Sequence, residues 1–237
     1  MKLKRFIFTA LLAIAFLSFS NIANAGSQQT SGVTAQTIID NARYYINETT
    51  SSFWSDAELL RWVNLGSRDI AARTRCLEQI QVVVLISGVT EYSLSSGASK
   101  YFGVSSAIYR DGTTYKGLVR GNVQSVGHTK DVGEPVYYYE WINNIGVYPT
   151  PGAAVSGNTV YVYTNVLPDA ITLTGVIALP AIYEQLLNLY VVAQALYRAR
   201  QFEEGNLYMT HYYHGINSFR QEYVKPIPGG LSEVIKK

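Results

Sequence analysis

Hydrophobic and polar positions follow a helical period at both ends of the chain and an alternating period between them. Residues 34–48 carry apolar side chains at three- and four-residue steps, which predicts a helix. A second helix is predicted to begin after Ser55. Ser55 and Glu58 form a capping box, in which each side chain binds the backbone N–H of the other residue. Helical spacing continues from Leu59, so this helix is expected to end near Arg75.

The middle of the chain, residues 79–174, alternates with a period of two and predicts short antiparallel strands. Two pairs of turn residues, Asp111-Gly112 and Asn143-Asn144, separate alternating runs and predict hairpins. Pro149 and Pro151 have no N–H to donate, so we expect them to end the strand before them. Short strands at this spacing indicate a small sandwich or barrel-like sheet.

Helical spacing returns at Pro180, a residue favoured at the first helical position because its missing N–H would be unpaired there. The apolar band that follows is wide, which indicates burial on two sides. Residues 203–206 are expected to interrupt this helix before a final amphipathic stretch that reaches Tyr223. The expected fold class is α+β. Helices from residues 26–78 and 175–225 would form one helical core, with an antiparallel β sandwich or barrel-like segment from residues 79–174 inserted and an extended tail from residues 226–237.

Residues 1–25 have the features of a secretory signal peptide: a basic start, an apolar run, and Ala-Asn-Ala before Gly26. The apolar run is shorter than the roughly 20 residues that a membrane helix needs. Removing these residues would leave 16 basic and 17 acidic residues, so the net charge of +2 would become −1. The segment indicates export. The alternatives are a start site placed too far upstream and a hydrophobic segment that packs against partners in an assembly.

Composition favours a protein whose surface can pack against partners and still remain soluble. Charged residues make up 15% of the chain, below the roughly 25% of typical globular proteins, and there are 19 tyrosines. Tyrosine covers apolar surface while keeping a polar tip, which suits packed interfaces. A net charge of +2 lacks the strong basic bias of nucleic-acid-binding domains.

No set of residues with catalytic or metal-binding spacing stands out. The single cysteine, Cys76, cannot form an internal disulfide, and its place at the end of an apolar-patterned helix favours packing over a reactive thiol. His211 and His214 lie three residues apart on the last helix but lack the Glu-x-x-His spacing of di-iron helices. His128 lies in a loop-like stretch with no nucleophile motif around it. We therefore expect a structural protein without a cofactor or a small-molecule substrate, and not an enzyme.

Three stretches together resemble the head-to-tail adaptor, or connector, proteins of tailed bacteriophages. Residues 53–64 are similar to the capped second helix of that family, with Trp54-Ser55-Asp56 followed by Glu58 and ending in Trp62-Val63-Asn64. Residues 139–141 and 145–151 are similar to its strand-and-proline element, and residues 179–197 to its Leu-Pro helix. Their order along the chain carries the resemblance, which spans about residues 34–225.

The resemblance implies a function in assembly. Adaptors of this family form a ring, commonly of twelve copies, between the portal and the tail or nozzle proteins, and DNA passes through the lumen without sequence-specific contacts. The resemblance thus places the protein at the head–tail junction of a virion, after assembly in the host cytoplasm. The C-terminal tail of a subunit often reaches the portal, and the apolar and proline residues expected at that contact are Pro226, Pro228, Leu231 and Ile235.

A ring contact joins two different faces of each subunit. The polar face of the second helix is either a solvated face or one of these two contact faces, and it carries Arg61, Asn64, Arg68, Asp69 and Arg73. The face of Trp62, on the apolar stripe of the same helix, is also expected at the subunit contact. The tyrosine-rich C-terminal helices would provide the other face, through Tyr190, Tyr197, Tyr208 and Tyr212. Two other functions remain open on the sequence: a secreted or periplasmic β-rich binding or surface protein, supported by residues 1–25, and an unrecognised hydrolase.

Overall fold

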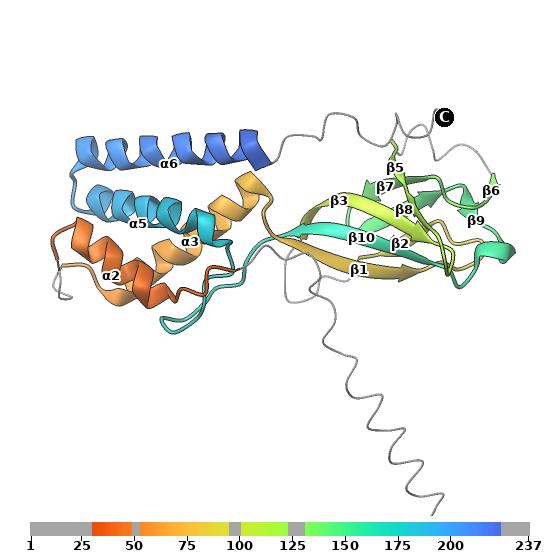
Figure 1. Ribbon diagram of the computed structural model, residues 1–237, viewed down its shortest axis with the longest axis horizontal. Helices are drawn as coiled ribbons and strands as arrows, with labels where there is room; N and C mark the ends of the chain where they lie inside the picture. Colours follow the sequence, from red (N-terminus) through yellow and green to blue (C-terminus); the bar gives the residue numbers. More distant parts are fainter. Residues whose placement is uncertain (1–29, 49–52, 95–100, 123–130, 224–237) are drawn as a thin grey trace, which may run out of the picture.

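The computed structural model describes residues 30–48, 53–94, 101–122 and 131–223, with side chains to Phe219. It shows an elongated molecule with a helical lobe and a β lobe side by side (Figure 1). The order of elements is two helices, ten strands and two further helices within these ranges. The expected α+β fold class is confirmed.

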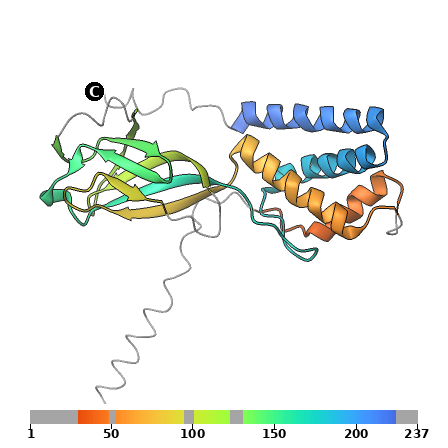
Figure 2. The same cartoon turned by 180° about the vertical axis from the view of Figure 1, so that it is seen from behind.

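The described residues of the helical lobe form four α-helices. Their bounds are Ala35–Tyr45 for α2, Asp56–Thr74 for α3, Glu184–Arg198 for α5 and Phe202–Tyr223 for α6. The capping box of α3 forms as expected. Ser55 Oγ accepts a hydrogen bond from the Glu58 N–H at 3.2 Å, and the Ser55 N–H donates to the Glu58 carboxylate at 3.3 Å. Seen from behind, α3 crosses the whole lobe before the chain enters the β lobe (Figure 2).

In the β lobe, the strands that the structure describes form two four-stranded sheets and one strand pair. The first has the order β1 (Glu78–Val84), β10 (Thr159–Val166), β3 (Tyr101–Arg110), β4 (Tyr115–Gly117). The second has the order β2 (Glu91–Ser93), β8 (Asn144–Tyr148), β7 (Tyr137–Trp141), β5 (Val119–Arg120). The pair joins β6 (Val132–Gly133) to β9 (Thr150–Pro151). Neighbouring strands are antiparallel except in the short β5–β7 and β6–β9 pairs.

Buried apolar residues form two separate clusters, one in each lobe. The helical cluster includes Ile38, Leu59 and Leu187, and the β cluster includes Tyr109 and Val160. The chain crosses between the lobes after α3 and after β10, where the Val166 N–H donates to the Leu77 carbonyl at 3.0 Å. Leu167, Ile171 and Leu173 follow this crossing and pack on the helical cluster, although their sequence pattern assigned them to the β segment.

Both hairpin turns lie one residue away from the predicted positions. Arg110 pairs with Tyr115, so the central turn residues are Gly112 and Thr113. Asp111 precedes them, and its carboxylate accepts from the Thr114 N–H at 2.9 Å. In the second hairpin Trp141 pairs with Asn144, which places Ile142 and Asn143 in the turn. Ile142 has a φ of 52°, an uncommon value for a β-branched residue.

The interruption between the last two helices also differs from the prediction. The break lies at Ala199–Gln201, where Arg200 has a φ of 62°. The Gln201 N–H donates to the Leu196 carbonyl and the Arg200 N–H to the Tyr197 carbonyl, which is the Schellman pattern of helix ends. Gly205, which suggested a break at residues 203–206, lies inside α6. A Cβ there would approach the Tyr197 ring to 2.7 Å, so glycine permits close packing of α6 on α5.

The predictions that Pro149 and Pro151 end strands have different outcomes. Pro180, expected to be the first residue of a helix, lies just before it. β8 ends at Tyr148, directly before Pro149, as expected. Pro151 instead lies within the short strand β9. It needs no N–H there, because the bonds to the β6 segment come from the Thr150 N–H at 3.0 Å and the Gly152 N–H at 3.3 Å. Pro180 has extended backbone and precedes the 3-10 turn Ala181–Tyr183 that leads into α5.

Candidate functional site

The outer face of α3 is covered in part by the chain itself. The Asn64 side-chain amide donates to the Ile171 carbonyl at 3.1 Å and accepts from the Ile171 N–H at 2.9 Å. One turn further along, Arg68 Nε donates to the Pro168 carbonyl at 3.3 Å. Trp62 is half-buried against the helical cluster, and Arg61 is exposed. Of the three interface candidates on α3, which are Arg61, Trp62 and Arg68, Arg61 therefore offers the most surface to a partner.

A tyrosine junction connects α3, α5 and α6, and we use this name for Asp69, Arg73, Tyr190, Tyr212 and Tyr213. The Tyr190 and Tyr212 rings meet edge to face, with 5.3 Å between their centroids. The Tyr212 hydroxyl donates to Asp69 Oδ2 at 2.5 Å, and Arg73 Nε donates to the same oxygen at 2.8 Å. The Arg73 guanidinium also lies 5.1 Å from the centre of the Tyr213 ring. The junction thus fixes α6 to α3 through one shared carboxylate.

The electrostatics of the tyrosine junction favour a structural role. Burial, followed by the hydrogen bond to Asp69, raises the pKa of Tyr212 well above its usual value. Burial also raises the pKa of Tyr190. The hydrogen bond to Asp69 raises the pKa of Arg73. Both tyrosines therefore remain protonated at neutral pH, which suits a fixed hydrogen-bond donor better than a proton-transfer group.

Close packing at the tyrosine junction depends on a glycine whose packing role the sequence analysis did not predict. A Cβ on Gly66 of α3 would lie 2.7 Å from Tyr190 Cδ1 and 2.8 Å from Leu187 Cδ1. The missing side chain lets α5 approach α3 closely enough for the Tyr190 ring to reach Tyr212. Gly66 lies on the apolar stripe of α3, and a glycine at such a position is the signal that could have identified a helix crossing.

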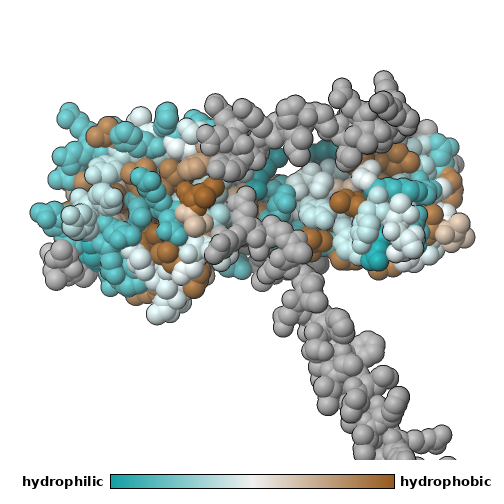
Figure 3. All heavy atoms as spheres, in the orientation of Figure 1, coloured by the Kyte–Doolittle hydropathy of each residue, from teal (hydrophilic) through white to brown (hydrophobic). Residues whose placement is uncertain are grey.

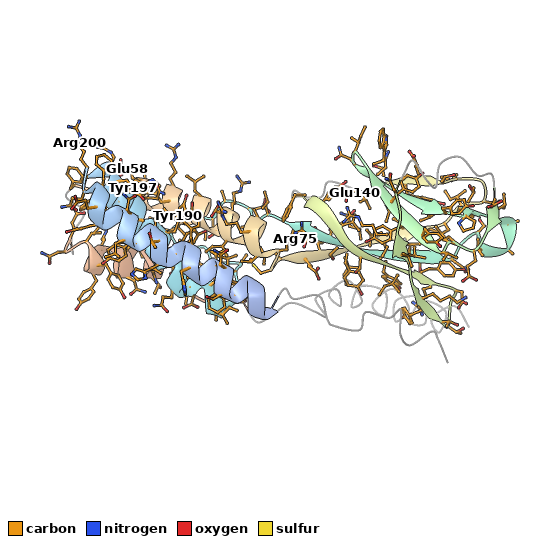
Figure 4. All side chains as sticks on the ribbon, turned by 90° about the horizontal axis from the view of Figure 1, so that it is seen from above. Glu58, Arg75, Glu140, Tyr190, Tyr197 and Arg200 are labelled. Carbon is orange, nitrogen blue, oxygen red and sulfur yellow. The ribbon has the colours of Figure 1, made fainter. Side chains whose placement is uncertain are left out.

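Tyr197 and Tyr208 lie on the two helices that pack together at the far end of the lobe. The Tyr197 hydroxyl donates to Asn206 Oδ1 at 2.8 Å, and Tyr208 packs in part on the helical cluster. Near Tyr197, Arg198 lies 3.6 Å from Glu58 of α3. Figure 4 shows Tyr197 and Glu58 at the outer end of the helical lobe, with Tyr190 nearer its middle and Arg75 where the lobes meet.

The predicted interface residues therefore differ in how much surface they expose. Arg61 is exposed, and five others are partly buried: Trp62, Arg68, Tyr190, Tyr197 and Tyr208. Tyr212 is 0% exposed and has no surface to offer a neighbouring molecule. Its contribution to an interface would come through the position of α6, which its hydroxyl and ring hold in place.

Sequence reasoning missed several exposed aromatic and apolar side chains. In the helical lobe these are Tyr44, Tyr45, Phe53, Phe202, Leu207 and Tyr213. In the β lobe they include three residues near β1 and three near β4 and β5: Val82, Val84, Ile86, Tyr115, Val119 and Val136. On the face seen in Figure 3, hydrophobic residues are interspersed with hydrophilic ones over both lobes.

The residues considered for chemistry do not form a site within the described ranges. Burial raises the pKa of the Cys76 thiol, which lowers its thiolate fraction at neutral pH. His211 and His214 are both exposed on α6, and the described residues contain no group of three or more His, Cys, Asp or Glu that could hold a metal. His128 lies outside the described residues, as does the segment 1–25. So do the predicted portal contacts Pro226, Pro228, Leu231 and Ile235.

Comparison with known proteins identified one family. A family model described as SU10 adaptor protein matches residues 33–228. This range covers nearly all of the described residues of both lobes. A search of curated proteins found no match. None of the helices in the described ranges combines the length and the hydrophobicity needed to cross a bilayer.

Proposed function

Because the chain belongs to the SU10 adaptor protein family, a family of phage head-to-tail adaptors, we propose that it assembles as a ring between portal and tail. The family supports a structural role at the head–tail junction of the virion. In this proposal twelve copies surround a lumen through which DNA passes without base-specific contacts. The ring binds the portal on one side and tail or nozzle proteins on the other, and it has no small-molecule substrate.

The match of the family model across both lobes is the observation that carries the proposal. The packing of the helical lobe is consistent with a rigid building block. Asn64 ties the segment after β10 to α3, and Asp69 ties α6 to α3. A subunit that transmits geometry between two larger assemblies needs a shape that does not change under load, and packed cores deform little.

We place the subunit contact of the helical lobe on the outer face of α3 and on the α5–α6 face. Arg61, with Trp62 and Arg68 beside it, would meet the neighbouring α5–α6 face that carries Tyr197 and Tyr208. Tyr190 and Tyr212 would support that face from beneath. The tail residues Pro226, Pro228, Leu231 and Ile235 would contact the portal, as the resemblance to adaptors implies.

Assembly can be tested with the purified full chain, alone and mixed with the portal protein of the same phage. Native mass spectrometry gives the copy number, and electron microscopy of the same samples shows whether a closed ring forms. Arg61→Glu should lower the ring fraction at least tenfold, while the matched Arg61→Lys variant, which keeps the charge, should assemble normally. A wild-type chain that stays monomeric with portal present contradicts the ring. Normal rings of Arg61→Glu contradict only the assignment of the α3 face.

The signal-like segment 1–25 favours a second candidate, an exported β-rich binding or surface protein. The two functions differ in the fate of this segment. Intact mass measurement of the protein from purified virions should show a chain that retains residues 1–25 if the adaptor proposal is right. A chain that begins at Gly26 and is recovered outside the cytoplasm would instead support export and contradict the adaptor proposal.

A further inference from the structure

The two edges of the β lobe differ in composition and lie on opposite sides. β1 and β2 are edge strands of the two sheets on one side, and β4 and β5 are the edge strands on the other. Figure 1 shows β1 along the lower border of the β lobe and β5 at the upper border. The Ile86 N–H donates to the Tyr92 hydroxyl at 3.0 Å, which holds the end of β1 against β2.

The β1 edge carries a row of exposed aliphatic side chains, which we call the β1 patch. Val82, Val84 and Ile86 are 57%, 54% and 55% exposed, and they alternate with the buried Val83 and Leu85. Proteins usually protect an edge strand with lysine, proline or inward-pointing charge. The seven residues of β1 include one charged residue, Glu78, at the strand start, and neither lysine nor proline. This strand is therefore poorly protected in the isolated subunit.

The opposite edge carries a second apolar group, which we call the β5 patch. Tyr115, Val119 and Val136 are 61%, 56% and 48% exposed. The Val119 N–H donates to the Val136 carbonyl at 2.9 Å, so these two valines are neighbours. Each edge of the β lobe thus presents exposed apolar side chains. The two patches differ in arrangement: the β1 patch is a single aliphatic row, whereas the β5 patch combines Tyr115 on β4 of the first sheet with the Val119–Val136 pair of the second.

Charge also distinguishes the two edges. Residues 77–94 contain two acidic residues, Glu78 and Glu91, and no basic residue. All described basic residues between β1 and β10 lie at or beside β4 and β5: Arg110, Lys116 and Arg120. Lys116 and Arg120 already contact Glu134 and Glu140 of their own chain, at 2.5 Å and 3.4 Å. The charges therefore act mainly on partner choice: two β1 edges repel each other, whereas a β1 edge and a β5 edge do not.

We propose that the β1 patch of one copy packs against the β5 patch of the next copy, so that the β lobes form a second belt of subunit contacts. This inference rests on the proposed ring. A head-to-tail contact closes into a ring only when each subunit presents two different, complementary faces. Two unlike apolar patches on opposite edges of one lobe meet that requirement. The occupant of each patch is thus a second copy of this chain.

Cysteine cross-linking tests the contact directly, because the chain has one cysteine, Cys76, which Cys76→Ala removes. In that background, Val84→Cys and Val119→Cys are placed in the same chain, and assembled protein is treated with a short bismaleimide. We expect a ladder of covalent multimers on denaturing gels, reaching the full copy number. Each single variant should remain monomeric on the same gel. An equimolar mixture of the two single variants should give no species larger than a dimer.

A matched control keeps Val119→Cys and moves the second cysteine from Val84 to Ser106, an exposed position on β3, which is separated from β1 by β10 in the same sheet. This pair should give no multimers. Cross-linking of Val84→Cys alone would show a symmetric contact and overturn the inference. Native mass spectrometry of the double-cysteine protein separates the two proposals. Intact rings without covalent multimers overturn the β-lobe contact alone, and absence of rings from wild-type protein overturns both.

Discussion

Removing the Tyr212 hydroxyl should weaken the helical lobe measurably without a change in its packing. Tyr212→Phe keeps the ring, and with it the edge-to-face contact with Tyr190 at 5.3 Å. The substitution deletes one hydrogen bond, from the Tyr212 hydroxyl to Asp69 Oδ2 at 2.5 Å. Any loss of stability therefore reports on that bond and on the carboxylate that loses its donor.

The size of the effect follows from the surroundings of the two groups. A hydrogen bond to a charged group contributes about 1.5–3 kcal/mol. Tyr212 is fully buried, which favours a large effect. The Asp69 side chain is 30% exposed and keeps its bond from Arg73, so water and the guanidinium compensate in part. We expect a loss of about 1.5 kcal/mol in the free energy of unfolding, at the lower end of the range.

Urea unfolding followed by circular dichroism at 222 nm suits this measurement, because the signal comes mainly from the helical lobe. The free energy is obtained by linear extrapolation, and an unchanged slope shows that the same surface unfolds in both proteins. Tyr213→Phe is the matched control. Tyr213 is the next residue, its side chain is exposed, and its ring keeps the Arg73 contact as phenylalanine. The control should change stability by less than about 0.5 kcal/mol.

Equal stabilities of the Tyr212→Phe and Tyr213→Phe proteins would refute this reasoning. That result would mean that the bond between α6 and α3 does not contribute to stability in solution. It would also remove the basis for assigning Tyr212 a supporting role beneath the α5–α6 face.

Three further predictions follow from the same kind of contact. Gly66→Ala forces a Cβ against the Tyr190 ring and should cost about 1–3 kcal/mol in urea unfolding, whereas Gly103→Ala, with nothing within 4 Å, should change little. Asn64→Ala leaves both backbone groups of Ile171 without their side-chain partner, so the Ile171 amide should exchange hydrogen at least tenfold faster by NMR. Burial, together with Glu91, raises the pKa of Tyr139 to about 12 in the folded chain. Between about pH 10 and 12 the Tyr139 hydroxyl therefore ionises in the unfolded chain but not in the folded one, so the free energy of unfolding falls as the pH rises. Tyr139→Phe should remove up to about 1.4 kcal/mol per pH unit of that loss, and identical alkaline unfolding curves for the two proteins would contradict the assignment.

Local features of the fold could be derived from the residues that form them. The Ser55–Glu58 capping box, the apolar stripe of α3 from Leu59 and the end of that helix near Arg75 involve neighbours a few positions apart. The hydrogen bonds and side-chain directions concerned are set by helix geometry alone. The turn positions were wrong by one residue, because the register of a hairpin depends on how the two strands pair, which also involves their other neighbours.

Contacts between distant residues required the structure. Gly205 is a residue that often marks the end of a helix, but here it lies inside α6. The Tyr197 ring packs against it, where a Cβ would not fit. Tyr212 belongs to a face that sequence spacing marks as a candidate surface, but its buried hydroxyl donates a hydrogen bond to Asp69, 143 positions earlier. Asn64 lies in the stretch that is similar to the capped helix of adaptors. Its two hydrogen bonds to Ile171 show that it fixes the segment after β10 to α3. None of these partners can be inferred from spacing along one element.

By itself, the sequence determined the order of helical and β segments, the helix start at Ser55 and the resemblance to phage adaptors, which the family match to residues 33–228 supports. These depend on periodicity and local hydrogen bonding, which nearby residues specify. The tertiary structure decided that the two lobes have separate cores, that Tyr212 is internal and that the β lobe has two unlike exposed edges. These three features result from packing between segments far apart in the chain, so no local pattern could specify them.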